Sequence, residues 1–284
     1  MYIVSGATGQ TGSVTAHTLL EKGLPVRVIV RSEEKGKSWK DLGAEVAVAD
    51  VRDADALTKA FAGGKVLYLM NPPNEQSEDM FVETEKIIKA FQTAIENSSP
   101  EKLVALSSVG AHLPSGTGPI ITNRMLEQAL GGSDIPTTFV RAGSFMENWN
   151  SVLDTVKSEG ILPSFFQPLD KNIPQVATED IGRVAAEAML ETTEGTQIKE
   201  LAGLPYSPND VAAAFSKVLG KEVKAIAVPE EQWMEIMKTF ASRRNAEAYY
   251  EMFQAANSDF LTFETENQIR GEVTIENYAG RALK

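Results

Sequence analysis

Short apolar runs alternate with longer amphipathic stretches over the first 150 residues. A short apolar run is typical of a buried strand, and an amphipathic stretch is typical of a helix that covers a sheet. Their alternation predicts a parallel sheet with helices on both faces. We expect strands at Ile3–Val4, Val26–Val30, Glu45–Val48, Lys65–Met70, Leu103–Ser107 and Thr137–Arg141, and helices at 13–22, 33–42, 54–61, 78–97 and 119–130.

The pattern changes after Asn150. Residues 160–174 contain three prolines and two phenylalanines, which predict an excursion over the sheet. A helix at 177–190, capped by Thr178, returns to the main domain, and further helices follow residue 208 around a short strand at Val223–Val228. The predicted fold is α/β, with a doubly wound, parallel-sheet Rossmann domain and a smaller, mostly helical C-terminal substrate lobe. The Rossmann domain spans 1–153, with 176–202 returning to it, and the lobe comprises 154–175 and 203–284.

Three glycines separate the first predicted strand from the first predicted helix, at positions 6, 9 and 12. Such a turn lets the backbone approach a pyrophosphate, because the unpaired N–H groups and the dipole of the helix point at it. The spacing is one residue wider than the GxGxxG of dehydrogenases. Strand, turn and helix stand in the required order, so dinucleotide binding is favoured over a merely steric turn. The usual strand order places the crevice at the carboxyl ends of strands one and four.

Arg31 follows the second predicted strand, where NAD-binding proteins usually carry an acidic residue for the ribose. An arginine there meets a 2′-phosphate through charge-assisted hydrogen bonds, and Ser32 and Lys35 stand close enough in the sequence to assist. This favours NADP(H) over NAD(H). Two alternatives stay open: Arg31 is merely exposed at a strand end, or Glu33 or Glu34 takes the ribose.

Further candidates follow the third and fourth strands. Asp50 and Val51 are placed to contact the adenine, although Asp50 is equally suited to cap the next helix. Asn71 and Pro72 begin the turn away from the sheet beneath the cofactor, and contact from the proline is a matter of shape.

Three residues near the end of the fifth strand are the catalytic candidates. Ser107 and Ser108 stand at that strand end, near the expected nicotinamide, where a hydroxyl can orient a substrate carbonyl. His112 follows and can donate a proton. The alternative for the serines is an ordinary turn, and for the histidine a loop position without a role.

Composition excludes several other functions. There are no cysteines and two histidines, so we expect no metal site. The net charge of −12 argues against nucleic-acid binding. A local cluster of Arg27, Arg31, Lys35, Lys37 and Lys40 fits a small anionic ligand or a solvated helix face. No apolar run approaches the length of about 20 residues that a membrane helix needs. The first strand leaves no room for a leader, so a cytoplasmic protein is expected.

The motifs together resemble the NmrA-like group of atypical short-chain dehydrogenase/reductases, over essentially the whole chain. They are the opening GATGQTG, Arg31, Ser107-Ser108, the run from Val140 to Asn148, the run from Val176 to Gly182, and the stretch Ser207–Gly220. The resemblance implies a Rossmann domain, a small lobe over the cleft, and NADP(H) or NAD(H) as the ligand. It also implies that Gly6, Thr8, Gly9, Gln10, Thr11 and Gly12 wrap the pyrophosphate, that Arg31 binds the 2′-phosphate, and that Phe145 and Asn148 lie beside the nicotinamide.

The sequence departs from the short-chain dehydrogenase pattern at the proton relay. The Tyr-xxx-Lys positions fall on Pro119 and Asn123, and we retain Asn123 as a cofactor-binding candidate. Members of the group it resembles that lack this pair are either reductases of conjugated acceptors or dinucleotide sensors. We predict the first: an NADP(H)-dependent oxidoreductase that transfers hydride to a quinone-like, aromatic or other conjugated small molecule. The alternative is a non-catalytic NAD(P) redox sensor that regulates a protein partner.

A flat apolar pocket would suit an aromatic acceptor. The substrate-binding candidates are Phe145, Met146, Asn148, Trp149 and Phe165, with Phe166 as a further lining residue. Ordinary core packing is the alternative for about half of the apolar ones. The oligomeric state and the physiological substrate have no signal in the sequence.

Overall fold

Eight parallel strands form the central sheet of the computed structural model, which describes residues 1–284. Their order is β13-β10-β6-β5-β4-β1-β2-β3. The strands are β1 Tyr2–Val4, β2 Val26–Val30, β3 Glu45–Val48, β4 Val66–Leu69, β5 Lys102–Ser108, β6 Thr137–Ala142, β10 Thr196–Ala202 and β13 Ile269–Arg270. Chain order reverses between β1 and β4, so the sheet is doubly wound. The predicted α/β Rossmann architecture is confirmed.

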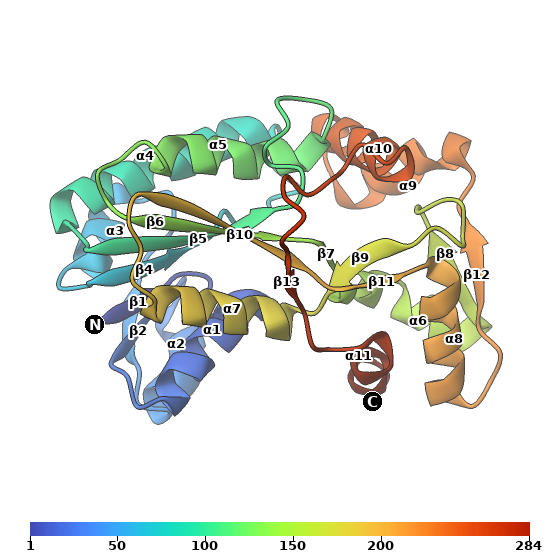
Figure 1. Ribbon diagram of the computed structural model, residues 1–284, viewed down its shortest axis with the longest axis horizontal. Coiled ribbons are helices and arrows are strands. Elements are labelled where there is room, and N and C mark those ends of the chain that lie inside the picture. The colour runs from blue at the N-terminus through green and yellow to red at the C-terminus, as the bar shows by residue number, and fades with distance from the viewer.

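Helices cover both faces of this sheet (Figure 1). One face carries α1 Gln10–Glu21, α2 Glu33–Asp41 and α7 Thr178–Leu190, and the other carries α3 Ala54–Phe61, α4 Met80–Ser98 and α5 Ile121–Leu130. Two separate apolar cores fill the two interfaces, with Leu19 and Val28 in one and Ile3 and Phe91 in the other. Alternate residues of each buried strand therefore face different cores.

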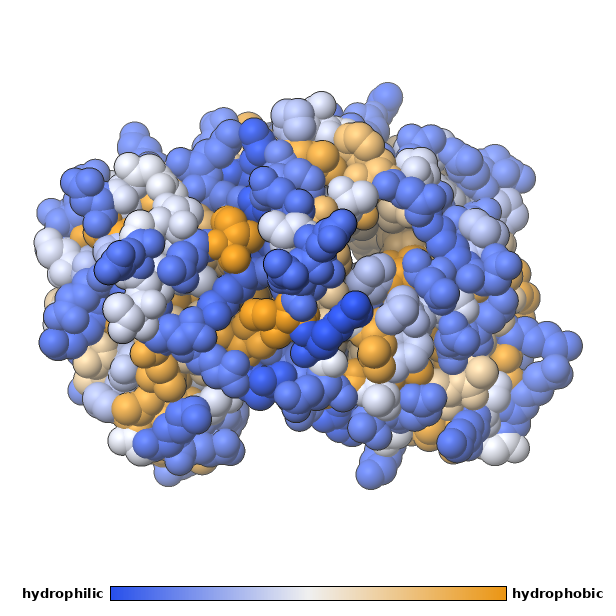
Figure 2. Space-filling view, in the orientation of Figure 1, coloured by the Kyte–Doolittle hydropathy of each residue, from blue (hydrophilic) through white to orange (hydrophobic).

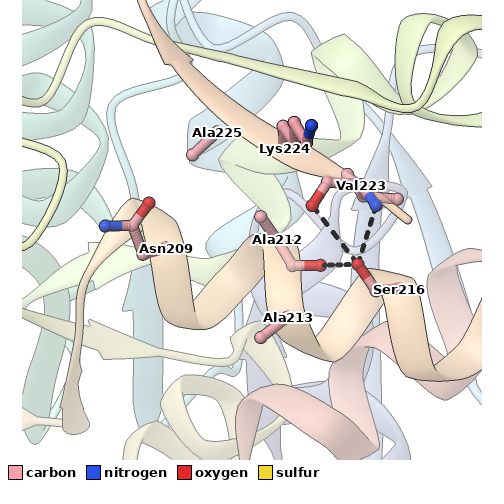
Figure 3. Close-up of a pocket in the computed structure, with 7 residues that line it drawn as sticks. All are labelled: Asn209, Ala212, Ala213, Ser216, Val223, Lys224 and Ala225. Atoms are coloured by element: carbon pink, nitrogen blue, oxygen red, sulfur yellow. Dashed lines mark hydrogen bonds between the residues drawn. The ribbon is translucent and has the colours of Figure 1, made fainter.

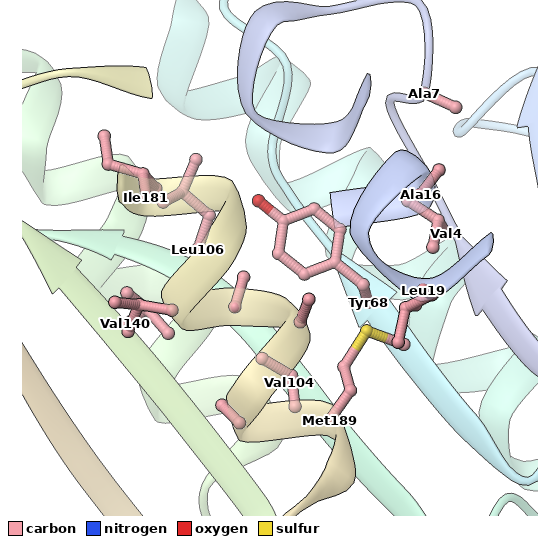
Figure 4. Close-up of a cluster of buried hydrophobic side chains, with 14 of the residues drawn as sticks. Val4, Ala7, Ala16, Leu19, Tyr68, Val104, Leu106, Val140, Ile181 and Met189 are labelled. Atoms are coloured by element: carbon pink, nitrogen blue, oxygen red, sulfur yellow. The ribbon is translucent and has the colours of Figure 1, made fainter. Parts of the chain in front are cut away.

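A buried tyrosine and a glycine set the packing of α1 against α7. Figure 4 shows the Tyr68 ring of β4 between these helices. Its hydroxyl lies 3.4 Å from the Thr11 hydroxyl at the start of α1, and burial raises the pKa of Tyr68 to about 12. A Cβ at Gly182 would lie 2.4 Å from Cβ of Val14, so glycine permits the close approach. Contacts with Tyr68 and with α7 thus fix the position of the start of α1.

The remaining elements form two small sheets and the C-terminal helices. One sheet joins β11 Leu204–Tyr206, β9 Ile173–Val176 and β7 Ser144–Phe145, and the other joins β12 Lys224–Ala227 to β8 Ile161–Ser164. The helices are α6 Leu153–Glu159, α8 Pro208–Leu219, α9 Glu230–Phe240, α10 Arg243–Asn257 and α11 Ile275–Ala282, with short 3-10 helices at Gly118–Ile120 and Met146–Val152. Residues 160–174, expected as an excursion, contain β8 and begin β9.

The strand signals differ in strength along the chain. The first six strands match their predicted ranges closely. Five of them are mostly buried, whereas β3, at the edge of the sheet, is exposed or half-buried. No separate strand was predicted at β10 or β13. The first three residues of β10 are exposed, and β13 is two residues long, so neither presents an apolar run. The domain division stays a prediction, although β13, expected in the smaller lobe, pairs with Leu201 and Ala202 of the main sheet.

The N-terminus of α7 holds the chain that follows β13. Ala177, not the predicted Thr178, is the N-cap, and the Thr178 N–H donates to Glu147 at 3.0 Å. Asp180, which is 2% exposed, accepts from the N–H groups of Glu272 and Val273, each at 2.9 Å. This carboxylate thereby fixes the connection from β13 to α11.

We expect Asp180→Ala to lower the free energy of unfolding by about 2 kcal/mol, because two backbone N–H groups lose a charged acceptor. Urea denaturation measures the change. Asp154→Ala is a matched control, since Asp154 is also acidic and in a first helical turn but is exposed. Equal stabilities of the two variants would contradict the anchoring role.

A groove of about 510 Å³ runs between α8 and β12 (Figure 3). The Ser216 hydroxyl closes one end, donating to the Ala212 carbonyl and accepting from the Val223 N–H, both at 2.8 Å. Its lining is mostly small side chains of α8. The groove lies in the small-sheet region, away from the carboxyl ends of β1 and β4.

Candidate dinucleotide site and catalytic cleft

The glycine turn connects β1 to α1 at the point where strand order reverses. Gly6 has a φ of 66°, which favours glycine, and a Cβ there would meet Met70 Sδ at 2.4 Å. A Cβ at Gly12 would lie 2.4 Å from the Gly6 carbonyl oxygen. The backbone of the turn therefore folds directly against the first turn of α1. This is the close approach that a pyrophosphate site requires.

The N-terminus of α1 carries no side-chain cap. Its N-cap is Gly9, whereas Ser32, Asp53 and Asp79 cap α2, α3 and α4 through their side chains. Helix geometry leaves the first N–H groups of α1, from Gln10 onward, without intrahelical acceptors. The side-chain caps of those three helices accept from one or two of these donors, whereas the donors of α1 have no side-chain acceptor and could bind an anion.

Two buried polar atoms without partners stand near the same edge of the sheet. Ser5 Oγ follows β1, and Asn71 Oδ1 follows β4. Asn71 donates through Nδ2 to the Thr84 hydroxyl at 2.9 Å, so its side chain is oriented and only the oxygen lacks a partner. Buried polar atoms are nearly always paired in folded proteins. Together with the glycine turn, they fit a polar ligand between β1 and β4.

Arg31 stands at the carboxyl end of β2, exposed and free of ion pairs. Ser32 caps α2 by accepting from the Lys35 N–H at 3.4 Å, and the Lys35 side chain is exposed. The five cations of the sequence cluster do not act together. Arg27 pairs with Glu45 at 2.8 Å, and Lys40 pairs with Glu33.

Asp50 is engaged by Arg52 and does not cap a helix. Arg52 donates to both Asp50 carboxylate oxygens, at 2.9 and 2.7 Å. These hydrogen bonds are the main reason that the pKa of Asp50 is lowered to about 2, and the positive charge of Arg31 contributes as well. The cap of α3 is Asp53, so the capping alternative for Asp50 is wrong. Val51 packs against the core beside α3 and α4.

Ser107 belongs to a buried charged network. Its hydroxyl donates to Glu127 of α5 at 2.5 Å, and Arg141 of β6 donates to both carboxylate oxygens of Glu127, at 2.8 and 2.7 Å. Arg141 also donates to Glu264, whose pKa falls chiefly through that hydrogen bond. Glu200 of β10 lies 3.9 Å from Arg141. The network joins β5, β6, β10 and α5 to the segment before β13.

The other catalytic candidates lie beside this network. The Ser108 hydroxyl donates to the Val109 carbonyl at 3.0 Å. His112 has a buried Nδ1 without a hydrogen-bond partner. Asn123, on α5, makes no side-chain hydrogen bond and is partly buried. Among the three catalytic candidates, His112 is therefore the one with a buried side-chain polar atom that lacks a hydrogen-bond partner.

Three of the substrate-binding candidates pack in apolar cores. Met146 is fully buried and Trp149 is 6% exposed, and both pack in the core of the small-sheet region, where Trp149 donates to Gln175 at 2.7 Å. Phe165 packs on Trp233 and Phe253, with ring centroids 5.8 and 4.9 Å apart. Core packing thus describes all three in this structure.

Phe145 and Asn148 are less buried, although Phe145 packs against the core on the α1 and α7 face of the sheet. Phe145 is half-buried on β7, and Asn148 is exposed. Figure 2 shows a hollow right of centre, over the region between α10 and the strands β7 and β9 of Figure 1.

Some residues at the site had no signal in the sequence. Glu127 and Glu264 meet around Arg141 although they are far apart in the chain. Asn245 of α10, fully buried, contacts the loop after β4. Lone polar residues within helical patterns look like ordinary surface positions, and only the tertiary fold brings them to the site.

A doubly wound sheet with a glycine turn at its switch point defines a Rossmann-fold protein. The chain belongs to the NmrA-like family, whose model matches residues 2–278. It is 29% identical over 228 residues to the (4-alkanoyl-5-oxo-2,5-dihydrofuran-3-yl)methyl phosphate reductase of Streptomyces griseus, covering 79% of this chain and 76% of that protein. It is 25% identical to eugenol synthase 2 of Clarkia breweri over 248 residues, 81% of this chain and 78% of that enzyme.

Solved structures share the fold over nearly the full length. Triphenylmethane reductase of Citrobacter sp. matches with a TM-score of 0.81 and 20% identity, covering 99% of both chains. An NADPH-dependent quinone oxidoreductase of Escherichia coli matches with a TM-score of 0.74 and 21% identity, covering 100% of both. These two proteins have been crystallised with NADP(H) and with NADPH, respectively. None of the helices in the present chain is long and apolar enough to cross a membrane.

Proposed function

We propose that this protein is an NADP(H)-dependent reductase that delivers hydride to a conjugated small-molecule acceptor. The observation that carries the proposal is the uncapped start of α1 against the glycine turn, with the unpaired Arg31 at the end of the adjacent strand. Reductases among the relatives, including a quinone oxidoreductase and a dye reductase, support it.

The cofactor half of the site follows from these elements. The N–H groups at the start of α1, with the turn from Gly6 to Gly12, bind the pyrophosphate. Arg31 and Lys35 bind the 2′-phosphate, and Ser32 keeps α2 in place as its cap. Thr8, Gln10 and Thr11 border the same anion. Asn71 offers its unpaired oxygen as an acceptor on the β4 side.

The catalytic half of the site suits an acceptor whose reduction needs no dedicated proton relay. When bound, the dinucleotide supplies a hydride to carbon. Hydride addition to a conjugated acceptor places the negative charge on its oxygen, where a hydrogen-bond donor stabilises it, and the anion then takes its proton from solvent. The Tyr-xxx-Lys relay, whose positions hold Pro119 and Asn123, is therefore not needed. His112 is the proposed donor, and Ser107 is occupied by Glu127. Phe145 is the proposed apolar contact.

The test is NADPH oxidation by the purified protein with quinones, enones and unconjugated ketones as acceptors. We expect turnover confined to the conjugated compounds, and a reduction in kcat of about a hundredfold in His112→Ala. Turnover of unconjugated ketones at the same rate would contradict the proposed acceptor class. Tight NADPH binding without any turnover would favour the alternative, a redox sensor acting on a protein partner, which the missing relay also suits.

A further inference from the structure

Hydrogen bonds from the connection between α9 and α10 hold the loop after β4. Residues 71–79 form no helix or strand. The Ser242 N–H donates to the Glu75 carbonyl at 2.9 Å, and Gln76 donates to the Phe240 carbonyl at 2.6 Å. The Tyr249 hydroxyl lies 3.3 Å from the Glu75 carboxylate. The C-terminal helices therefore fix a loop that has no regular structure of its own.

Asn245 is at the centre of this contact. It is fully buried, and its Nδ2 donates to the carbonyls of Glu75 and Ser77, both at 2.9 Å. Its Oδ1 accepts from the Met80 N–H, the first of α4, at 2.9 Å. The Asn245 side chain thus forms hydrogen bonds both with carbonyls of the loop and with the first N–H group of α4. Buried backbone groups that lose such partners are costly.

A continuous chain of hydrogen bonds leads from Asn245 to the dinucleotide site. Met80, whose N–H binds Asn245, accepts from the Thr84 hydroxyl through its carbonyl at 2.8 Å. The Thr84 hydroxyl accepts from Asn71 Nδ2 at 2.9 Å. Asn71 then presents Oδ1, buried and without a partner. The orientation of that oxygen depends on the start of α4, which Asn245 holds.

The sheet order assigns Asn71 to one half of the ligand. β2, which carries Arg31, and β4, which carries Asn71, lie on opposite sides of β1. A dinucleotide that crosses the switch point places its adenosine half over β2 and its nicotinamide half over β4.

We propose that Asn245 is a positioning residue for the nicotinamide half of the site, and this rests on the proposed function. By fixing the loop after β4 and the start of α4, Asn245 orients Asn71 for that half of the ligand. The docking of α10 therefore sets the affinity for the nicotinamide half alone. The adenosine half, bound through Arg31 and α1, is independent of α10.

The test compares two ligands in the intact protein. Fluorescence titration measures the Kd of NADPH, and calorimetry measures the Kd of adenosine 2′,5′-bisphosphate, which lacks the nicotinamide half. We expect Asn245→Ala to raise the Kd of NADPH about tenfold, because an acceptor is displaced, and to leave the Kd of the bisphosphate within about twofold. A general loss of structure would weaken both ligands together.

Two further variants complete the design. Gln254→Ala is the matched control on the same helix, because Gln254 contacts only Glu230 and Tyr250 at the surface, and it should change neither Kd. Tyr249→Phe removes the hydrogen bond between α10 and Glu75 in the loop after β4, and it replaces Asn245→Ala if that variant does not fold. It should raise only the Kd of NADPH, by about threefold.

The outcomes separate this inference from the proposed function. Wild-type protein that binds neither ligand would refute the proposed function and this inference with it. Tight binding by the wild type, with both Kd values unchanged or both raised alike in Asn245→Ala and Tyr249→Phe, would overturn the positioning role alone.

Discussion

Gly12→Ala is expected to weaken NADPH binding by more than about a hundredfold. The added Cβ would lie 2.4 Å from the Gly6 carbonyl oxygen and 2.9 Å from that of Ser5, and both are backbone atoms that cannot rotate away. Either the glycine turn or the first turn of α1 must shift. Each charge-assisted hydrogen bond to the pyrophosphate is worth roughly 1.5–3 kcal/mol, so losing two accounts for this drop.

Gly280→Ala is the control for a helical glycine. It lies in α11, and a Cβ there meets nothing within 4 Å. We expect unchanged NADPH affinity and equal or slightly higher stability, because alanine favours the helix. Fluorescence titration and thermal unfolding measure both variants. Full NADPH affinity in folded Gly12→Ala would show that the pyrophosphate does not bind at this turn.

Arg31→Ala is expected to lower the preference for NADPH over NADH by about ten- to a hundredfold. The guanidinium is exposed and unpaired, so its removal leaves no buried charge behind. A charge-assisted contact to the 2′-phosphate is worth roughly 1.5–3 kcal/mol, and NADH lacks that phosphate. The Kd of NADH should therefore stay nearly constant while that of NADPH rises.

Lys37→Ala removes an exposed positive charge from α2, six residues further along the chain, and serves as the control for net charge. It should alter neither Kd by more than about twofold, because screening weakens distant exposed charges. If Arg31→Ala and Lys37→Ala reduce NADPH affinity equally, the effect is one of general charge and Arg31 has no specific contact.

Much of the fold could be predicted because its main strands are buried on both faces. Val26–Val30 and Thr137–Ala142 are apolar or β-branched apart from one arginine each, and they lie where strands were expected. The glycines after β1 and the polar residues after β2 and β4 carry the proposed cofactor half in the same way, and those site assignments stay predictions. In both cases the signal is local: the chemistry needs neighbouring residues of a given type.

The catalytic half depends on residues that are distant in the chain. Ser107 looks like a strand-end hydroxyl in the sequence, and only the fold reveals that this hydroxyl donates a hydrogen bond to Glu127, in a network with Arg141. Likewise, Met146 and Trp149 have the composition of a substrate pocket but pack in a core. An apolar side chain fits both environments equally well, so composition cannot separate them.

Calorimetric titration of the intact protein with NADPH and with NADH is the most direct test of the central proposal. We expect a single NADPH per chain, bound at least about ten times more tightly than NADH, because Arg31 and the uncapped start of α1 together bind the phosphates. Equal affinity for the two dinucleotides, or binding of neither, would contradict the proposal.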